Sequence, residues 1–139
     1  MTAIRDVVLD TGPIVAALDT SDQWHRACSE ALRRVLARCV TTEAVLTEAC
    51  HFIERGRGRA AIALEFILDA DVPVLPLDHA ALRHAAFLMD RYRDVPMDFA
   101  DASLVVVAEA LGAKRVLTID RRGFSAYRLA RGAPFELLP

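Results

Sequence analysis

Short β-type runs alternate with longer helical segments along this chain, and that alternation is the strongest constraint on its fold. The runs expected to be strands are Val7–Leu9, Cys39–Thr41, Val72–Leu75, Val116–Ile119 and Phe135–Leu138. Strands separated by helical crossovers pair in parallel and are covered by helices on both faces. The sequence therefore predicts an α/β protein with a central parallel sheet.

Capping residues and helix breakers mark where the helices should begin and end. The expected helices are one that starts at the turn Asp10–Pro13, Trp24–Ala37 capped by Ser21 or Asp22, Glu43–Glu54 capped by Thr42, Ala60–Asp69, a helix from Asp78 to Tyr92, and Asp98–Leu111 closed by Gly112. No repeat or low-complexity tract interrupts this pattern. Residues 1–139 are therefore expected to form a single domain.

The composition is that of a globular protein, with 54% hydrophobic and 26% charged residues. The longest apolar runs, such as Leu104–Ala108, are far too short to span a membrane. The first ten residues lack the long apolar region of a signal peptide. Cys28, Cys39 and Cys50 are odd in number and lie among apolar residues, which argues against a disulfide framework. We expect a cytoplasmic protein with no membrane segment.

Four acidic residues stand where the predicted topology would bring them to one edge of the sheet. Asp10 directly follows the first strand and Asp120 directly follows the fourth. Asp101 lies in the first turn of the helix that leads into the fourth strand, and Glu48 occupies an otherwise apolar helix face after the second. Acids gathered in this way repel one another, and a hard divalent cation relieves the repulsion. The pattern predicts a site for Mg²⁺ or Mn²⁺.

Each acid alone has an ordinary explanation as a turn, cap or surface residue, so the argument depends on the four together. A zinc site built from His25 and Cys28, or from Cys50 and His51, matches no closed zinc pattern. The segment Asp10–Gly12 also resembles the nucleophile of haloacid-dehalogenase-type phosphatases, but the second Asp of that motif is absent. A phosphatase is accordingly the weaker enzyme hypothesis.

Basic charge is carried almost entirely by arginine, which supplies 16 of the 17 basic residues, although the net charge is −2. Arginine binds phosphate through two parallel hydrogen bonds, so arginine clusters are candidate RNA contacts. They occur at residues 33–38, at residues 55–59, and at Arg121 and Arg122. The last two directly follow Asp120 and are expected to contact RNA.

Four segments follow one another along the chain: Val8–Pro13, the helix Thr42–Glu48, Asp98–Ala102, and Leu117–Asp120 with the following Phe124. Together they resemble the PIN-domain ribonucleases, and more narrowly the toxins of VapBC toxin–antitoxin modules. The resemblance covers essentially the whole chain. It implies a three-layer α/β/α fold with a central parallel sheet of about five strands in the order 3-2-1-4-5.

The resemblance also implies roles for individual residues. Asp10, Glu48, Asp101 and Asp120 would form the catalytic acidic group, with Asp10 and Asp101 as direct ligands of Mg²⁺ or Mn²⁺. The hydroxyl groups of two threonines, and one further acid, would support the site. These supporting residues are Thr11, Thr118 and Asp98.

The function implied is a metal-dependent endoribonuclease toxin that cleaves RNA with an activated water molecule. Its implied partners are RNA, a cognate antitoxin protein and a second copy of the chain in a homodimer. The alternative is a catalytically silent domain of the same fold that binds RNA or a protein. The complete acidic group favours catalysis over this alternative.

Overall fold

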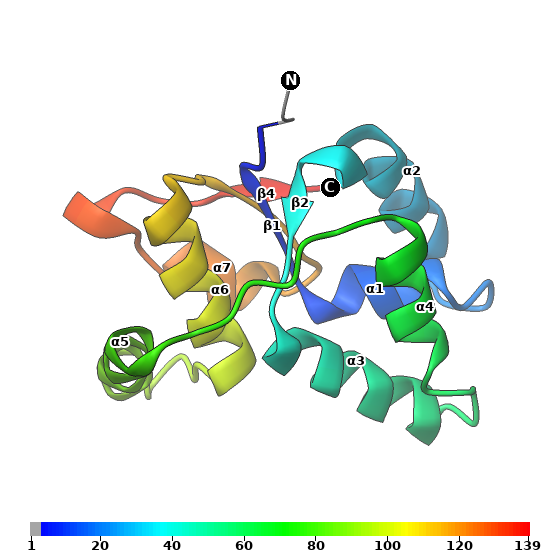
Figure 1. The fold of residues 1–139 in the computed structure, drawn as a ribbon, viewed down its shortest axis with the longest axis horizontal. Helices are drawn as coiled ribbons and strands as arrows, with labels where there is room; N and C mark the ends of the chain where they lie inside the picture. Colours follow the sequence, from blue (N-terminus) through cyan, green and yellow to red (C-terminus); the bar gives the residue numbers. More distant parts are fainter. Residues whose placement is uncertain (1–3) are drawn as a thin grey trace.

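A computed structural model describes residues 4–139, in which four parallel strands form one sheet (Figure 1). The strands are β1 (Val7–Leu9), β2 (Cys39–Val40), β3 (Arg115–Leu117) and β4 (Glu136–Leu138). Their order is β2-β1-β3-β4, and every adjacent pair is parallel. Val8 of the central strand pairs with Val40 on one side and with Val116 on the other.

The expected third strand, Val72–Leu75, is reduced to a single bridge. Val74 pairs in parallel with Thr41, beyond the end of β2. The N–H of Thr41 donates to the carbonyl of Pro73 at 3.0 Å, and the N–H of Leu75 donates to Thr41 at 2.9 Å. Pro73 and Pro76 have no N–H to donate, which limits the ladder. The spatial order expected from the sequence is therefore confirmed, but with four strands instead of about five.

Helices cover the sheet. They are α1 (Thr11–Ala17), α2 (His25–Val35), α3 (Glu43–Arg55), α4 (Ile62–Asp69), α5 (His79–Arg91), α6 (Phe99–Leu111) and α7 (Arg121–Ala126), with short 3₁₀ turns η1 (Leu36–Arg38) and η2 (Ala130–Gly132). In Figure 1, α5, α6 and α7 lie on one side of the strands, and α1, α2 and α4 lie on the other. The predicted α/β architecture is confirmed.

Most helix boundaries agree with the sequence signals to within two residues. Thr42, Asp78 and Asp98 cap α3, α5 and α6 with their side chains, and Gly112 closes α6 with a left-handed φ of 69°. Asp22 caps only a turn: it accepts from the N–H of Trp24 at 2.7 Å, and α2 begins at the next residue without a side-chain cap. The short helix α7 was not expected, because six residues that include Gly123 show no helical periodicity.

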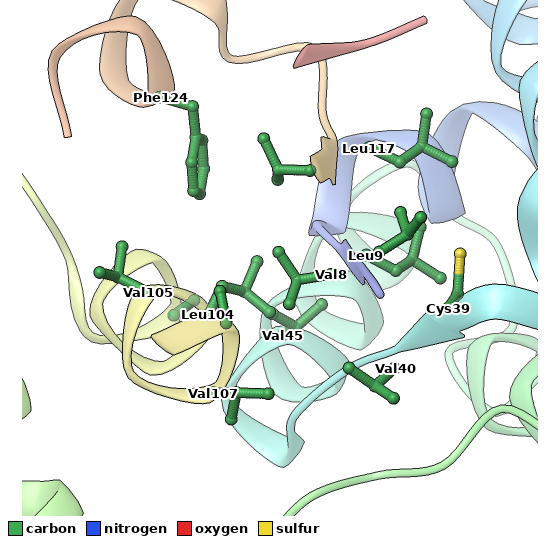
Figure 2. Packing of buried hydrophobic residues seen from close by; sticks show 14 of the residues in the cluster. Val8, Leu9, Cys39, Val40, Val45, Leu104, Val105, Val107, Leu117 and Phe124 are labelled. Atoms are coloured by element: carbon green, nitrogen blue, oxygen red, sulfur yellow. The ribbon is translucent and has the colours of Figure 1, made fainter. Parts of the chain in front are cut away.

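The core lies between the sheet and the helices on either side of it. Val8, Val45 and Leu104 come from β1, α3 and α6, meet near its centre and are completely buried (Figure 2). Every residue of α6 from Ala102 to Ala108 is buried, so this helix is covered on nearly all sides. This packing fixes the start of α6 against the start of α3.

The structure bears on two further expectations. All three cysteines are free, and Cys28 and Cys39 are buried. Within residues 4–139, no helix combines the length and the apolar character that crossing a membrane requires. The expectation about a signal peptide falls partly on residues 1–3, which lie outside the described residues.

Candidate active site

A cavity of about 370 Å³ lies at the edge where β1 and β3 end. It is lined by Asp10, Thr11, Gly12, Val15, Asp22, Glu48, Phe52, Asp98, Asp101, Ile119 and Asp120. The four acids singled out from the sequence are therefore brought together, and Asp98 joins them. Asp22 is a sixth acid that sequence reasoning treated only as a cap. None of these lining residues is basic.

Asp10 follows β1 and stands at the N-terminus of α1. Its side chain is only 6% exposed, and its Oδ2 accepts a hydrogen bond from Thr118 Oγ1 at 2.7 Å. Burial raises the pKa of Asp10 to about 6, against the lowering effect of hydrogen bonds from Thr118 and Thr11. The negative charges of Asp120 and Asp98 raise it further. Asp10 is thus a buried carboxylate with neutral hydrogen-bond donors.

Asp98 and Asp101 hold each other in a reciprocal cap at the start of α6. The N–H of Asp101 donates to Asp98 Oδ1 at 2.8 Å, and the N–H of Asp98 donates to Asp101 Oδ2 at 3.2 Å. Burial raises the pKa of Asp101 to about 8, and the charges of Asp98 and Asp10 add to this effect. The cap therefore fixes the side chains of Asp98 and Asp101 close to Asp10.

Glu48 is half-buried on α3, nearly two turns beyond the cap residue Thr42. Thr42 Oγ1 also lies 2.7 Å from Ser103 Oγ, and this buried hydrogen bond joins the starts of α3 and α6. Burial raises the pKa of Glu48 to about 7; Thr11 lowers it through a hydrogen bond and Asp98 raises it. The helix pair thus holds Glu48 next to Asp98.

Asp120 lies three residues beyond the end of β3, not directly after the strand as expected. It caps α7, accepting from the N–H of Gly123 at 3.1 Å. Its own N–H donates to Thr118 Oγ1 at 2.9 Å, so one hydroxyl connects Asp120 to Asp10. A Cβ at Gly123 would lie 2.6 Å from Asp120 Oδ2, so the cap requires glycine here.

The two threonines expected to support the site both lie beside its acids, with different contacts. Thr118 is completely buried and bonds to Asp10, as described above. Thr11 lines the cavity, and its hydroxyl lies 3.4 Å from the carbonyl of Val45 on α3. Thr11 therefore connects the first turn of α1 to the helix that carries Glu48.

Tyr127 is a residue of the site that sequence reasoning missed. Its side chain is completely buried, and its hydroxyl donates toward Asp101 Oδ2 and the carbonyl of Pro96, each at 3.2 Å. Burial raises its pKa, as does the charge of Asp101. No sequence signal points to it, because a lone tyrosine after a short helix usually belongs to the core.

The arginines that were candidate RNA contacts do not line the cavity, and some of them are paired with acids. Arg38 forms two hydrogen bonds to Asp6, and Arg59 pairs with Glu65, so neither is a free phosphate ligand. Arg121 and Arg122 are exposed at the start of α7 but do not line the cavity. The guanidinium of Arg121 lies 3.5 Å from the carbonyl of Pro139.

The donors in this cavity suit a hard divalent cation. Carboxylate oxygens are the preferred protein ligands of Mg²⁺ and Mn²⁺, and positive charge would counteract both the burial and the mutual repulsion that raise the pKa values here. Among residues 4–139, no three Asp, Glu, His or Cys side chains converge closely enough to enclose an ion, which also leaves the zinc hypothesis without support. Mg²⁺ is commonly bound by only one or two carboxylates and several water molecules. Asp10 and Asp101 fit that mode.

Comparisons with known proteins agree with this arrangement. The PIN domain profile matches residues 7–130. Ribonuclease VapC26 of Mycobacterium tuberculosis is 27% identical over 135 residues, which are 96% of this chain and 100% of that protein.

Two solved structures resemble this one in fold. The crystal structure of Mycobacterium tuberculosis VapC20, described as a sarcin–ricin loop cleaving toxin, gives a TM-score of 0.68 at 22% identity, over 79% of this chain and 86% of that one. VapBC2 from Rickettsia felis, bound to a DNA fragment from its promoter, gives 0.67 at 13% identity, over 96% and 98%. At these identities the likeness concerns the fold alone.

The raised pKa values predict how stability depends on pH in the metal-free protein. The pKa of Asp10, Glu48 and Asp101 is about 6, 7 and 8 in the folded state, above the ordinary 3.8, 4.5 and 3.8. Between about pH 4 and pH 8 the folded protein therefore holds protons that the unfolded chain has released, and its stability falls as pH rises. Thermal unfolding in EDTA should show the midpoint falling by roughly 5–10 °C from pH 5 to pH 8.

The control for this measurement is Asp101→Asn, which removes the most strongly shifted acid. This variant should unfold at a higher temperature than wild type at pH 8 and show a smaller dependence on pH. A midpoint that stays constant or rises between pH 5 and pH 8 in wild type would contradict the assignment of buried, mutually repelling carboxylates.

Proposed function

This chain belongs to the PIN-domain family, and on that premise we propose that it is a metal-dependent endoribonuclease, the toxin of a type II toxin–antitoxin system. The observation that carries the proposal is a cavity that is lined by six acids and by no basic residue. These acids are Asp10, Asp22, Glu48, Asp98, Asp101 and Asp120. The full-length similarity to a ribonuclease of the VapC type supports the same activity.

Asp10 and Asp101 would hold the Mg²⁺ or Mn²⁺ ion. Asp10 is buried, Asp101 is half-buried, and burial strongly raises the pKa of each. When bound, the cation supplies the positive charge that neutralises the scissile phosphate and lowers the pKa of a coordinated water molecule. Asp120 is exposed and lies beside the same threonine hydroxyl as Asp10. It would complete the cation site.

Glu48 is suited to orient the attacking water and to accept a proton from it. Burial raises the pKa of Glu48 to about 7 in the metal-free protein, so its carboxylate is a better proton acceptor than an exposed glutamate. The hydrogen bond between Thr42 and Ser103 fixes α3 and therefore the position of Glu48. The chain thus positions the reacting groups and accepts a proton at Glu48, while the cation contributes positive charge.

The family also suggests protein partners. We propose that an antitoxin protein binds this chain and that two copies form a homodimer. The similarity in fold to VapBC2 from Rickettsia felis, solved with a DNA fragment from its promoter, supports an antitoxin partner. Exposed apolar side chains such as Phe52, Leu68 and Phe87 offer surface for such contacts.

RNA cleavage by this protein should require a divalent cation. The purified protein should cut single-stranded or loop RNA in Mg²⁺ or Mn²⁺ and should not cut in EDTA, because the carboxylates alone repel phosphate. Asp10→Asn should lower the rate at least about 100-fold, since several kcal/mol of charge stabilisation are lost. Cleavage of labelled RNA, with circular dichroism to verify the fold, measures both. Undiminished cutting in EDTA would refute metal dependence, and RNA binding without cutting would favour the silent binding domain.

The second prediction concerns toxicity. Expression of this chain alone should arrest bacterial growth, and expression of Asp10→Asn to the same level should not. The reason is that the variant keeps the surface of the protein but loses the charge that holds the cation. Growth curves with immunoblots for protein level provide the measurement. A variant as toxic as the wild type would show that the toxicity does not come from nuclease chemistry.

The third prediction concerns Arg121 and Arg122. Changing both to Ala should weaken RNA binding and reduce the slope of log affinity against log salt by about 0.7 for each RNA phosphate that is no longer neutralised. The rate at saturating RNA should fall less than in Asp10→Asn. Fluorescence anisotropy at several salt concentrations measures the slope, and Arg26→Ala, which is exposed on α2, is the matched control. Unchanged affinity and slope would exclude these two residues from RNA binding.

A further inference from the structure

The hydroxyl of Tyr127 is positioned between two acceptors and has only one hydrogen to donate. Asp101 Oδ2 and the carbonyl oxygen of Pro96 both lie 3.2 Å away. Such distances are long for an O–H···O bond and are consistent with a hydrogen shared between the two acceptors. Because a carboxylate is the stronger acceptor, the bond to Asp101 dominates when Asp101 is charged.

Both hydrogen bonds that the Asp101 side chain accepts fall on the same oxygen. The N–H of Asp98 donates to Oδ2 at 3.2 Å, as does the hydroxyl of Tyr127. Within residues 4–139 no donor is bonded to Asp101 Oδ1. Two donors on one oxygen determine the rotation of the carboxylate about its Cβ–Cγ bond, which leaves Oδ1 available to a ligand in the cavity.

The ring of Tyr127 has little freedom to move. It makes edge-on contacts with Tyr92 and Phe124, with ring centroids 5.2 and 5.1 Å apart. Gly123 closes the remaining side, because a Cβ there would lie 3.0 Å from the Tyr127 hydroxyl and 2.6 Å from Asp120 Oδ2. A completely buried, tightly packed ring therefore carries its hydroxyl to a fixed point behind Asp101.

We propose that Tyr127 is a positioning residue that turns the Asp101 carboxylate so that Oδ1 binds the divalent cation. The inference rests on the proposed metal-dependent function and adds to it a residue outside the acidic group. Hydrogen bonds from residues behind a metal ligand fix its orientation, and their loss commonly lowers metal affinity by about 10–100-fold. Tyr127 acts through Asp101 and does not touch the cation.

The test is Mn²⁺ binding by isothermal titration calorimetry, with the metal alone as the probe. Tyr127→Phe keeps the ring and removes the hydroxyl, and it should weaken Mn²⁺ binding by about 10-fold or more. The matched control is Tyr92→Phe, in the same aromatic cluster, whose hydroxyl accepts from the N–H of Arg128 at 3.0 Å and does not contact an acid. This control should bind Mn²⁺ like the wild type.

A second readout separates positioning from a purely structural role. In RNA cleavage, the Mn²⁺ concentration giving half-maximal rate should rise in Tyr127→Phe, and high Mn²⁺ should restore most of the rate. The thermal midpoint in EDTA serves as the check on folding, and Tyr92→Phe reports what loss of one hydrogen-bonded tyrosine hydroxyl does to this midpoint. If the thermal midpoint of Tyr127→Phe is lowered, Mn²⁺ binding by all variants is measured at a temperature at which circular dichroism shows them to be folded.

The outcomes distinguish this inference from the function on which it rests. If Asp101→Asn binds Mn²⁺ as tightly as wild type, Asp101 is not a ligand and the inference about Tyr127 falls. If the wild type binds no Mn²⁺ and cuts RNA in EDTA, the metal-dependent function itself is overturned. If Asp101→Asn weakens binding and Tyr127→Phe leaves it unchanged or tighter, only the role of Tyr127 is overturned. Weakened binding in Tyr127→Phe, with an unchanged affinity in Tyr92→Phe, supports the inference.

Discussion

Parallel pairing of β1 with a strand on each side determines where the acidic residues lie. Asp10 follows β1, Glu48 lies on the helix after β2, and Asp101 lies on the helix that leads into β3. Because all these strands run in the same direction, their carboxyl ends and the loops beyond them meet at one edge. The strands are only two or three residues long, and a shift of one residue would turn each side chain to the opposite face. The buried valines that pair across the sheet, such as Val8 with Val40 and Val116, therefore fix the site as well as the core.

Bringing these acids together in a partly buried cavity lowers the stability of the folded protein. Asp10, Glu48 and Asp101 all have raised pKa values, with burial as the largest cause in each case. Their partners within the chain are neutral: the hydroxyl of Thr118, and backbone N–H groups at the starts of helices. Such donors satisfy the oxygen atoms without removing the charge repulsion. The stability that the site loses must come from the apolar packing elsewhere.

Residues whose role depends on local signals could be predicted from the sequence. The caps at Thr42, Asp78 and Asp98 follow from side chains that accept from backbone N–H groups three residues on, and the parallel order follows from the crossovers. Residues whose role depends on distant contacts could not be predicted. Tyr127 reaches Asp101 across 26 positions, and that contact leaves no periodicity or spacing in the sequence. The reduced third strand could be predicted only in part. The sequence shows Pro73 and Pro76, but how far they shorten the ladder depends on where Thr41 pairs with this segment.

The two ends of β1 place an aspartate in opposite electrostatic environments. At the edge where the strands begin, Asp6 accepts two hydrogen bonds from Arg38, which precedes β2, and one from Arg115, the first residue of β3. The bond to Arg38 is the main reason that the pKa of Asp6 is lowered, to about 2. Asp10, at the opposite end of β1, has no basic neighbour in its cavity, and its pKa is raised to about 6. Arginine side chains balance the charge of Asp6 at the start of the strands, whereas no basic side chain lines the acidic cavity at their ends. A cation from solution, as proposed above, would supply the positive charge that the chain itself does not place there.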